Sequence, residues 1–354
     1  MRRDRLRILV TGIHGDSGQG LVKALRFSRK AVLLHGCDSS ESGLGAAFVP
    51  WLHLVPPARD RGDYVVRLDQ ICRKHRLDAV LPSLPVEIDA LSTRTDPVTL
   101  PSGVPVICLP RTYRDVFDDK LLSYRSLERY VPLAPYADGA DRSAVAALVR
   151  RSGFPIVVKR RKGRGGESFH CVEREQDLAE ALQKTPDPVV QAFIDDAEGE
   201  FTVGVFATGD RTTAISFRRR LGRTGSSWFA ETVEDSEVLE YARTIARVSG
   251  LRGSANIQAR KSSGGVRLLE INARFSSLAP ARAMAGFRDV EWSIAQALGE
   301  EPEFPVDGYR HIRFHRFVHE MVDEGEGYLP VPEWSRWIRG RIVPESPEER
   351  YETA

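Results

Sequence analysis

The sequence predicts an α/β domain followed by an α+β domain, and three observations support this assignment. Residues 1–112 alternate short apolar strand candidates with helix candidates, which is typical of a parallel, doubly wound sheet. After Pro110 the strand candidates come in pairs around short turns, which is typical of antiparallel hairpins. The 354 residues contain no internal repeat and are enough for two or three hydrophobic cores.

Composition excludes several classes of protein. The net charge of +2 implies no general attraction to nucleic acid or to a membrane surface, and we expect neither as a partner. The apolar run at residues 8–10 is too short for a signal sequence, and no segment is long enough to span a membrane, so we expect a cytoplasmic protein. Four widely spaced cysteines predict buried thiols instead of disulfides or a zinc site: Cys37, Cys72, Cys108 and Cys171.

The N-terminal block is expected to start with a strand at 7–11, a glycine-rich turn at 12–18 and a helix through Leu25. Further strands are predicted at 31–35, 78–82 and 104–109, with helices at 67–75 and 86–92.

The middle block is expected to contain helices at 115–130, 142–152, 175–184, 235–249 and 280–299. Its predicted strands are 155–160, 168–172, 189–194, a hairpin of 200–208 with 211–219, and a hairpin of 254–261 with 266–273. A strand is predicted at 311–318, and the polar end of the chain is expected to be partly disordered.

The predicted strand 266–273 carries the most informative pattern in the chain. Alternation of side chains directs Leu269, Ile271 and Ala273 into a core and places Glu270, Asn272 and Arg274 on the other face. Carboxylate and amide oxygens suit a hard cation such as Mg²⁺ that is shared with phosphate oxygens. The same string also fits the solvated face of an ordinary half-buried strand.

The strand that precedes this one adds a third oxygen ligand. If the hairpin turn is centred on Gly264, Gln258 lies opposite Glu270 and Asn256 lies opposite Asn272. Directly opposed residues share a face, so Gln258 would join the polar side. A slip of one residue would put Gln258 on the wrong face.

A second element is a lysine that leads into a glycine-rich turn. Lys159 ends an apolar strand and is followed by Gly163, Gly165 and Gly166. Glycines let backbone N–H groups approach phosphate oxygens, and the lysine supplies charge. The segment lacks the G-x-x-x-x-G-K-[ST] spacing of a P-loop, and a flexible basic hairpin is an equally good interpretation of it alone.

A third element is the apolar strand that includes Gln191, Ala192, Phe193 and Ile194, followed by Glu200. Such a segment could offer backbone groups to a purine and a carboxylate to ribose hydroxyls. Taken alone, it also fits a core strand and a surface acid.

Together these parts resemble the ATP-grasp superfamily, especially its carbamoyl-phosphate-synthase-like and carboxylate–amine ligase branches, over about residues 112–300. The resemblance implies three parts: a Rossmann-like pre-ATP-grasp domain at 1–112, an ATP-grasp domain at 113–302 and a C-terminal extension at 303–354. The ATP-grasp domain would consist of two α+β subdomains that clamp ATP, and its lid subdomain would span about 142–193. It assigns Lys120, Lys159 and the glycine loop to phosphates, residues 191–194 to adenine, Glu200 to ribose, and Gln258, Glu270 and Asn272 to metal.

The resemblance implies an ADP-forming ligase that uses ATP with Mg²⁺ or Mn²⁺. A substrate carboxylate would attack the γ-phosphate to form an acyl phosphate, and Arg274 would hold the carboxylate or the transferring group. An amine would then displace phosphate and give a small peptide or amide. The implied partners are small-molecule carboxylate and amine substrates, and a homodimer is among the assemblies that the resemblance allows.

The chain departs from the family pattern in three places, one of which is the extra charge of Arg164 and Glu167 in the glycine-rich loop. Gln258 stands where many members carry an acid, although carbamoyl phosphate synthases also carry glutamine there, and Gln191 replaces a common glutamate. The basic segment with Arg218, Arg220 and Arg223 favours an anionic substrate, and a solvated basic loop is its plainer interpretation.

Three other functions are weighed against the ligase. Gly12, Gly15 and Gly18 match the glycine spacing of short-chain dehydrogenases and suggest an NAD(P)-dependent oxidoreductase, but no tyrosine has a lysine four residues on. A catalytically dead nucleotide-binding protein is disfavoured by the intact lysine and E-x-N-x-R pattern. Carbamoyl-phosphate-synthase-like phosphorylation of carboxyphosphate or carbamate is the third alternative, although those enzymes carry two such halves in one chain.

Overall fold

The computed structural model describes residues 5–163, 169–195, 198–222 and 227–316, together with the backbone of two later strands. The chain divides into two compact units, residues 1–317 and 318–354. The second unit contains an antiparallel hairpin of β15 (Met321–Asp323) and β16 (Tyr328–Pro330). The predicted boundaries at 112/113 and 302/303 stay a prediction, and the predicted disorder of the end of the chain lies outside the described residues.

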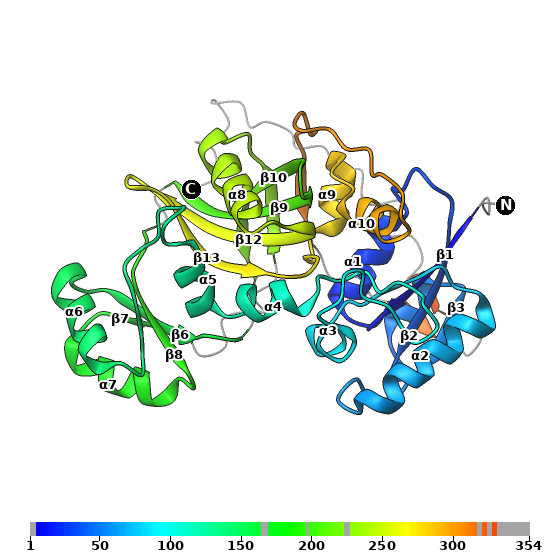
Figure 1. Ribbon diagram of the computed structural model, residues 1–354, viewed down its shortest axis with the longest axis horizontal. Helices are drawn as coiled ribbons and strands as arrows, with labels where there is room; N and C mark the ends of the chain where they lie inside the picture. The colour runs from blue at the N-terminus through cyan, green and yellow to red at the C-terminus, as the bar shows by residue number, and fades with distance from the viewer. Residues whose placement is uncertain are drawn as a thin grey trace, which may run out of the picture. The chain divides into compact units, whose positions relative to one another are not determined.

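A parallel four-stranded sheet forms the N-terminal part, as the sequence predicts (Figure 1). Alternate residues of its central strand pack on two cores: Ile8 and Val10 meet α1, whereas Leu9 meets α2. The strands, in sheet order, are β3 (Trp51–Leu54), β2 (Val32–Asp38), β1 (Leu6–Thr11) and β4 (Ala79–Leu81); the helices are α1 (Asp16–Leu25), α2 (Arg61–His75) and α3 (Pro85–Leu91), with a 3₁₀ turn at Leu44–Phe48.

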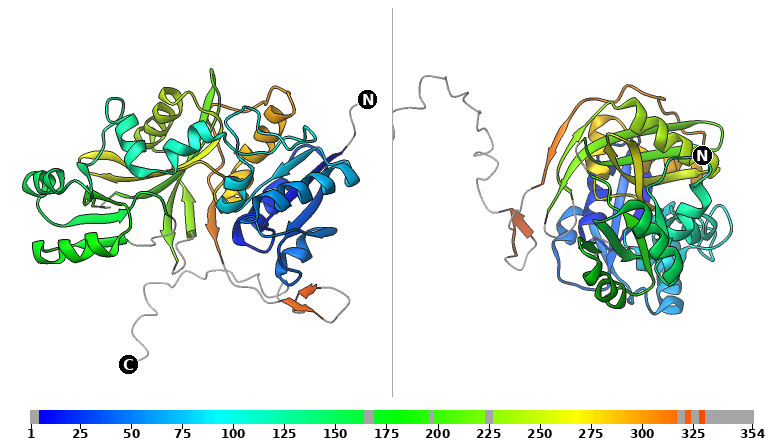
Figure 2. Two further views of the ribbon diagram at one scale, coloured as in Figure 1. Left: turned by 60° about the horizontal axis from the view of Figure 1, so that its bottom comes forward. Right: turned by 90° about the vertical axis from the view of Figure 1, so that its left-hand side faces the viewer.

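A six-stranded sheet forms the centre of the first unit, and its neighbouring strands are antiparallel. One face packs Phe201, Val203 and Val205 against α8, and the other packs Phe206 and Phe217 against α9 and α10. Figure 2 shows β14 (orange) at one edge. In sheet order the strands are β13 (Gly265–Asn272), β12 (Arg252–Ser262), β9 (Gly199–Thr208), β10 (Thr212–Leu221), β11 (Ser227–Thr232) and β14 (Arg313–His315), and the helices are α8 (Ser236–Val248), α9 (Ala279–Ala285) and α10 (Asp289–Ala297).

A second four-stranded sheet, antiparallel throughout, contains the predicted strand of Lys159; we call it the lid sheet. Its helices pack on one apolar core that includes Ile156, Val158 and Val190. In sheet order its strands are β5 (Tyr136–Asp138), β8 (Pro188–Ala192), β6 (Ile156–Arg160) and β7 (Phe169–Val172), and its helices are α6 (Arg142–Ser152) and α7 (Glu175–Lys184).

The predicted register of β12 with β13 is correct at the polar face. Gln258 pairs with Glu270, and Asn256 pairs with Asn272. A β-bulge follows, since Ala259 pairs with Leu268 and leaves Leu269 without a partner in β12. The expectation that Leu269 points into the core is therefore wrong: the bulge shifts the alternation, and Leu268 is the fully buried residue instead.

Two predicted helices are each broken in two. The helix expected at 115–130 is α4 (Arg111–Phe117) and α5 (Lys120–Leu127), because the Asp119 side chain accepts hydrogen bonds from the N–H groups of Leu121 and Leu122 and starts a new helix. The helix expected at 280–299 is interrupted after α9 by Gly286, which has a positive φ.

The remaining differences concern short strands. The strand predicted at 104–109 reaches the sheet only through an isolated bridge between Val80 and Val106. Strands β3, β5 and β11 were not predicted, because three to six residues leave little room for a recognisable alternation. Among the described residues, no helix is both long and apolar enough to cross a membrane.

A buried ion pair fixes the two helices under the central sheet. Arg282 on α9 donates to Asp289 of α10 at 3.0 Å, and both side chains are fully buried. Arg282 also donates to Asn256, and Ser254 donates to Asp289 at 2.8 Å. This network connects the helices to β12, the strand that carries Gln258.

We expect Asp289→Ala to lower the free energy of unfolding by about 3–5 kcal/mol, because it leaves the Arg282 guanidinium buried without its counter-charge. Urea denaturation followed by circular dichroism measures the change. Glu180→Ala removes an exposed ion pair with Lys184 and is the matched control, with an expected loss below about 1 kcal/mol. Equal losses in the two variants would contradict the assigned role of the buried pair.

Candidate functional site

A cavity of about 600 Å³ lies where the ends of β6 and β13 meet the start of α5. The E-x-N-x-R segment lines it together with α3 and α4. Most of the lining is charged, with six cationic side chains against four acidic ones: Arg111, Arg114, Lys120, Arg160, Lys162 and Arg274, and Asp89, Asp115, Asp118 and Glu270. Such a surface favours an anionic ligand that brings its own cation.

Glu270 is the acid at the centre of the site. Its Oε2 lies 3.0 Å from Lys120 Nζ, and its Oε1 accepts a hydrogen bond from Asn272 Nδ2 at 3.1 Å. Burial alone would raise the pKa of Glu270, but Lys120 and Asn272 together hold the pKa below its ordinary value. Glu270 is therefore a carboxylate at neutral pH, which is the form that binds a cation.

Asn272 and Arg274 continue the polar face of β13. Arg274 Nη2 donates to Asn272 Oδ1 at 3.2 Å, and its Nη1 donates to the backbone carbonyl of Phe275. The three side chains thus form a chain of hydrogen bonds from Glu270 to Arg274, as strand alternation predicts.

Lys159 is buried between the lid sheet and the central sheet. Its Nζ donates to Gln191 Oε1 at 2.8 Å and to the backbone carbonyl of Leu269 at 3.2 Å. Tyr124 Oη donates to the same carbonyl at 2.6 Å. Burial, and then the nearby charge of Lys120, lower the pKa of Lys159 to about 7.

The bulged residue of β13, Leu269, supplies the carbonyl oxygen in this contact. Leu269 has no partner in β12, and its carbonyl faces Lys159 and Tyr124. Because β13 is the edge strand of the central sheet, its outward carbonyls are available to other elements. The Leu269 carbonyl is the one that holds the lysine.

Glu200 and Gln258 lie on the same face of the central sheet and are joined by Arg219, while Arg260 contacts only Glu200 of this pair. Glu200 accepts from Arg219 Nη2 at 2.8 Å and from Arg260 Nη2 at 3.2 Å. Arg219 Nη2 also donates to Gln258 Oε1 at 2.6 Å. The acid expected to meet ribose is therefore already paired with cations.

The sequence alone did not predict a role for Arg219 and Arg260, but the pairing of the strands indicates both residues. Arg260 pairs directly with Glu200 across β12 and β9, and Arg218 pairs with Phe201 across β10 and β9. The next residue, Arg219, therefore lies opposite Glu200. Once the strand order β12-β9-β10 is known, two arginines flank one acid.

Arg218 and Arg220 lie on the opposite face of β10 from Arg219. Both are exposed, with the guanidinium of Arg218 5.7 Å from the ring centroid of Phe201 and that of Arg220 4.8 Å from that of Phe229. The structure does not bring these two residues to the site. Arg223, the third predicted substrate residue, lies outside the described residues.

The segment expected to meet adenine, residues 191–194, starts in the last two residues of β8 and continues beyond the strand. Gln191 is buried and turns its side chain toward Lys159, while the backbone N–H of Ala192 donates to the Pro135 carbonyl at 2.8 Å. Arg260 donates to the Ile194 carbonyl at 3.0 Å and stacks 5.8 Å from the ring centroid of Phe193, which is exposed. One arginine thus connects this segment to Glu200.

The glycine loop is described only at its start. Gly163 lines the cavity beside Arg160 and Lys162. Gly165 and Gly166 lie outside the described residues, so their predicted contact with phosphate stays a prediction.

The oxygen atoms of the site fit a hard divalent cation. Glu270, Asn272 and Gln258 supply one carboxylate and two amide oxygens from two paired strands. Mg²⁺ prefers such ligands and completes its shell with water and phosphate oxygens. The amino groups of Lys120 and Lys159 lie beside them and can balance phosphate charge.

Part of the chain is similar in sequence to known proteins. The profile of a family described as "ATP-grasp in the biosynthetic pathway with Ter operon" matches residues 184–317. The arginine-specific large chain of carbamoyl phosphate synthase from Geobacillus stearothermophilus is 27% identical over 191 residues, which are 51% of this chain. This chain covers only 18% of that relative's length.

Solved structures share the fold at lower identity. A biotin carboxylase from Campylobacter jejuni superposes with a TM-score of 0.67 at 16% identity, over 84% of this chain and 72% of that one. An L-amino acid ligase from Bacillus licheniformis superposes with a TM-score of 0.61 at 16% identity, over 84% of this chain and 75% of that one.

The lowered pKa of Lys159 predicts a distinctive pH dependence of stability. Between about pH 7 and 10, the unfolded chain keeps a proton on this lysine that the folded chain has lost, so stability rises with pH. Relative to Lys159→Met, the wild-type protein should gain up to about 1.4 kcal/mol per pH unit in this window. Urea titrations between about pH 6.5 and 9 measure the difference.

Lys184→Met is the control, since Lys184 is an exposed lysine of α7. We expect the same pH slope for this variant and the wild type. An unchanged slope in Lys159→Met as well would show that the buried amine titrates normally.

Proposed function

We propose that the chain is an ADP-forming carboxylate–amine ligase of the ATP-grasp superfamily that uses ATP and Mg²⁺. The observation that carries the proposal is the position of Lys159. It lies between the lid sheet and β13, next to a Glu270–Lys120 ion pair and above an oxygen-rich face. Of these groups, Lys120, Glu270 and Asn272 line a cavity that suits a polyphosphate and its cation.

The proposed roles follow from charge. Glu270 and Asn272, with Gln258, would hold Mg²⁺, which when bound supplies positive charge at the phosphates. Lys120 and Lys159 would contact phosphate oxygens directly. Phosphoryl transfer depends mainly on positioning and electrostatic stabilisation, so no protein nucleophile is required.

The proposed reaction has two steps. A carboxylate oxygen of the substrate attacks the γ-phosphorus of ATP, the bond to the β,γ-bridging oxygen breaks, and ADP leaves. The amine nitrogen of the second substrate then attacks the acyl carbon, phosphate leaves, and the amine loses a proton as the amide forms. Arg274 lies at the cavity end of the E-x-N-x-R chain, where its guanidinium can hold the carboxylate or the transferring group.

The cavity supports an anionic acid as the substrate. Arg111 donates to the backbone carbonyls of Ser92 and Asp89, which holds its side chain at the wall of the cavity. Arg114 is buried and pairs with Asp89 at 2.7 Å and Asp118 at 2.9 Å. The cationic side chains at the α4 end and Arg274 at the β13 end line the same space.

The experiment that tests the proposal is a screen for ADP and phosphate release that depends on Mg²⁺. Amino acids and hydroxy acids are paired with amines, and mass spectrometry identifies the product. Phosphate release with bicarbonate in place of an organic acid would favour the carbamoyl-phosphate-synthase-like alternative. NADPH binding without nucleotide turnover for any pair would overturn the ligase in favour of an oxidoreductase.

Glu270→Gln should reduce ADP formation at least about 100-fold, because it removes the anionic cation ligand and the partner of Lys120. Arg274→Ala should have a similar effect on turnover. Glu180→Gln, at an exposed position of α7, is the control and should keep wild-type activity. Circular dichroism confirms that each variant is folded, and a fully active Glu270→Gln protein would refute the metal assignment.

Arg219→Ala should raise the KM for ATP about tenfold or more, because Arg219 joins Glu200 to Gln258 on the site face. Arg218→Ala is the matched control, since it removes the neighbouring arginine on the opposite face. We expect its KM to stay within about twofold of the wild-type value. The reverse result would show that the outer arginines contact the substrate, as the sequence first suggests.

A further inference from the structure

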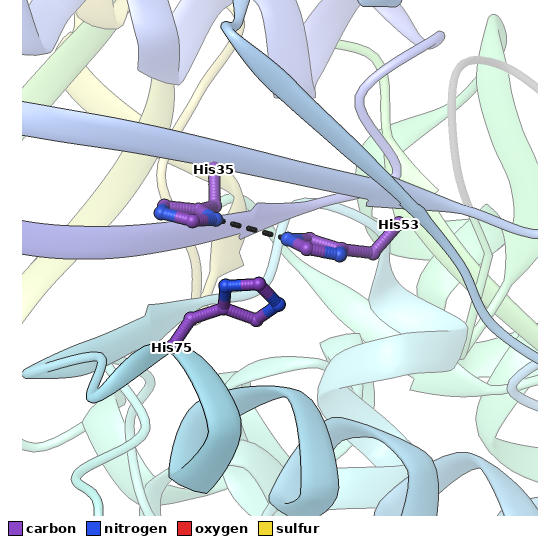
Figure 3. Close-up of side chains that lie close together, drawn as sticks. All are labelled: His35, His53 and His75. Atoms are coloured by element: carbon purple, nitrogen blue, oxygen red, sulfur yellow. Dashed lines mark hydrogen bonds between the residues drawn. The ribbon is translucent and has the colours of Figure 1, made fainter.

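Three histidines converge on the parallel sheet, away from the proposed ATP site. His35 lies on β2, His53 lies on β3, and His75 is the last residue of α2 (Figure 3). One ligand nitrogen from each ring can be chosen so that all three lie within 4.8 Å of one another. We propose that His35, His53 and His75 form a binding site for a divalent transition-metal ion such as Zn²⁺.

The fold places these side chains together for a simple reason. His35 pairs with Trp51 in the parallel register, and His53 is two residues beyond Trp51, so both histidines share one face of the sheet. Helix α2 packs on this face and ends there with His75. The ring of Trp51 stacks on His35 at a centroid distance of 4.6 Å and limits the motion of that ring.

His35 and His53 turn a nitrogen toward each other, and the His75 ring lies beside both. His35 Nδ1 lies 2.9 Å from His53 Nε2, and the ring centroids of His53 and His75 are 4.7 Å apart. Zn–N bonds of about 2.0–2.1 Å in a tetrahedral site put ligand nitrogens roughly 3.4 Å apart. Small side-chain rotations therefore convert the observed cluster into three ligands, with a fourth position for water.

Two of the three rings, those of His35 and His53, are neutral at neutral pH. A metal ion binds the lone pair of neutral imidazole. Burial, and then the neighbouring histidines of the cluster, lower the pKa of His35 to about 4; burial and then His75 lower the pKa of His53 to about 4. Protons therefore compete weakly for both nitrogens.

The type of ligand atom in the cluster decides which metal ion suits it. Arg7 of β1 and Arg67 and Lys74 of α2 add positive charge near the rings, and within the described residues the cluster contains three histidines and no acidic ligand. Mg²⁺ and Ca²⁺ require oxygen ligands, so they do not suit this site. Imidazole nitrogens suit Zn²⁺, Ni²⁺, Cu²⁺ and Co²⁺, whose bonds to nitrogen do not depend on a carboxylate.

Backbone carbonyls hold the side chains of two of these basic neighbours. Arg7 Nη1 donates to the His75 backbone carbonyl at 3.1 Å, and Arg67 Nε donates to the Leu54 carbonyl at 3.2 Å.

A bound ion would join β2, α2 and the four-residue strand β3 at the end of the sheet. Its expected effect is therefore on stability, through binding to the folded chain alone.

The test uses the full chain without a histidine tag, freed of metal by chelation and kept in a large excess of Mg²⁺ so that the oxygen-rich site is occupied. Calorimetric titration with Zn²⁺ should give about one ion per chain, and added Zn²⁺ should raise the melting temperature by several degrees. Co²⁺ should give the visible absorption of a tetrahedral site.

His53→Gln and His75→Gln should each weaken Zn²⁺ binding at least about tenfold and lose the cobalt spectrum. His311→Gln, at an exposed position elsewhere, is the matched control and should bind like the wild type. All four cysteines are kept in every variant, so the difference isolates the histidines. The metal-free melting temperature of each variant reports any loss of stability that is unrelated to metal.

Equal Zn²⁺ affinity and equal melting shifts in the wild type and the two cluster variants would overturn the proposal. A cluster that only stacks and hydrogen-bonds would lower the metal-free melting temperature of the variants without changing the Zn²⁺-dependent increment. Mg²⁺-dependent ADP formation is measured separately. Failure of the metal-site proposal therefore leaves the ligase proposal intact, and failure of the ligase proposal leaves the metal-site proposal intact.

Discussion

The contact of Lys159 with the Leu269 carbonyl holds the candidate ATP site together. It connects β6 of the lid sheet to β13 of the central sheet, and Tyr124 of α5 donates to the same acceptor. The acceptor belongs to the bulged residue of β13, which has no partner in β12, and β13 is the edge strand of its sheet. The edge of the central sheet thus supplies the carbonyl that holds the amine of the lid sheet.

The junction between α4 and α5 serves the same site. Asp118 accepts a hydrogen bond from the Ala273 N–H at 3.2 Å, and Asp119 caps α5 and forms a two-pronged pair with Arg161. These contacts place Lys120, the first residue of α5, next to Glu270. The break in the predicted helix is therefore what brings a lysine to the cavity.

The sequence predicts those parts of the candidate site whose interacting residues are close to each other in the chain. The register of Gln258 with Glu270 follows from one short hairpin, and the alternation of Glu270, Asn272 and Arg274 follows from one strand. The bulge at Leu269 could not be predicted, because the contact that it serves lies 110 residues away, at Lys159. The histidine cluster was missed for the same reason: its members lie on three elements whose order in the sheet a sequence alone does not give.

The neutral residue at position 258 can be understood from its neighbours. Arg219 lies 2.6 Å from Gln258 Oε1 and 2.8 Å from Glu200, which Arg260 also contacts. A glutamate at 258 would compete with Glu200 for Arg219 and would add a third carboxylate to a half-buried face that already carries Glu200 and Glu270. With glutamine, the two arginines balance Glu200, and the amide oxygen can still serve a cation without adding charge. The proposed site therefore relies on one carboxylate, Glu270, and the phosphate charge is balanced by Mg²⁺, by Lys120 and by the protonated form of Lys159.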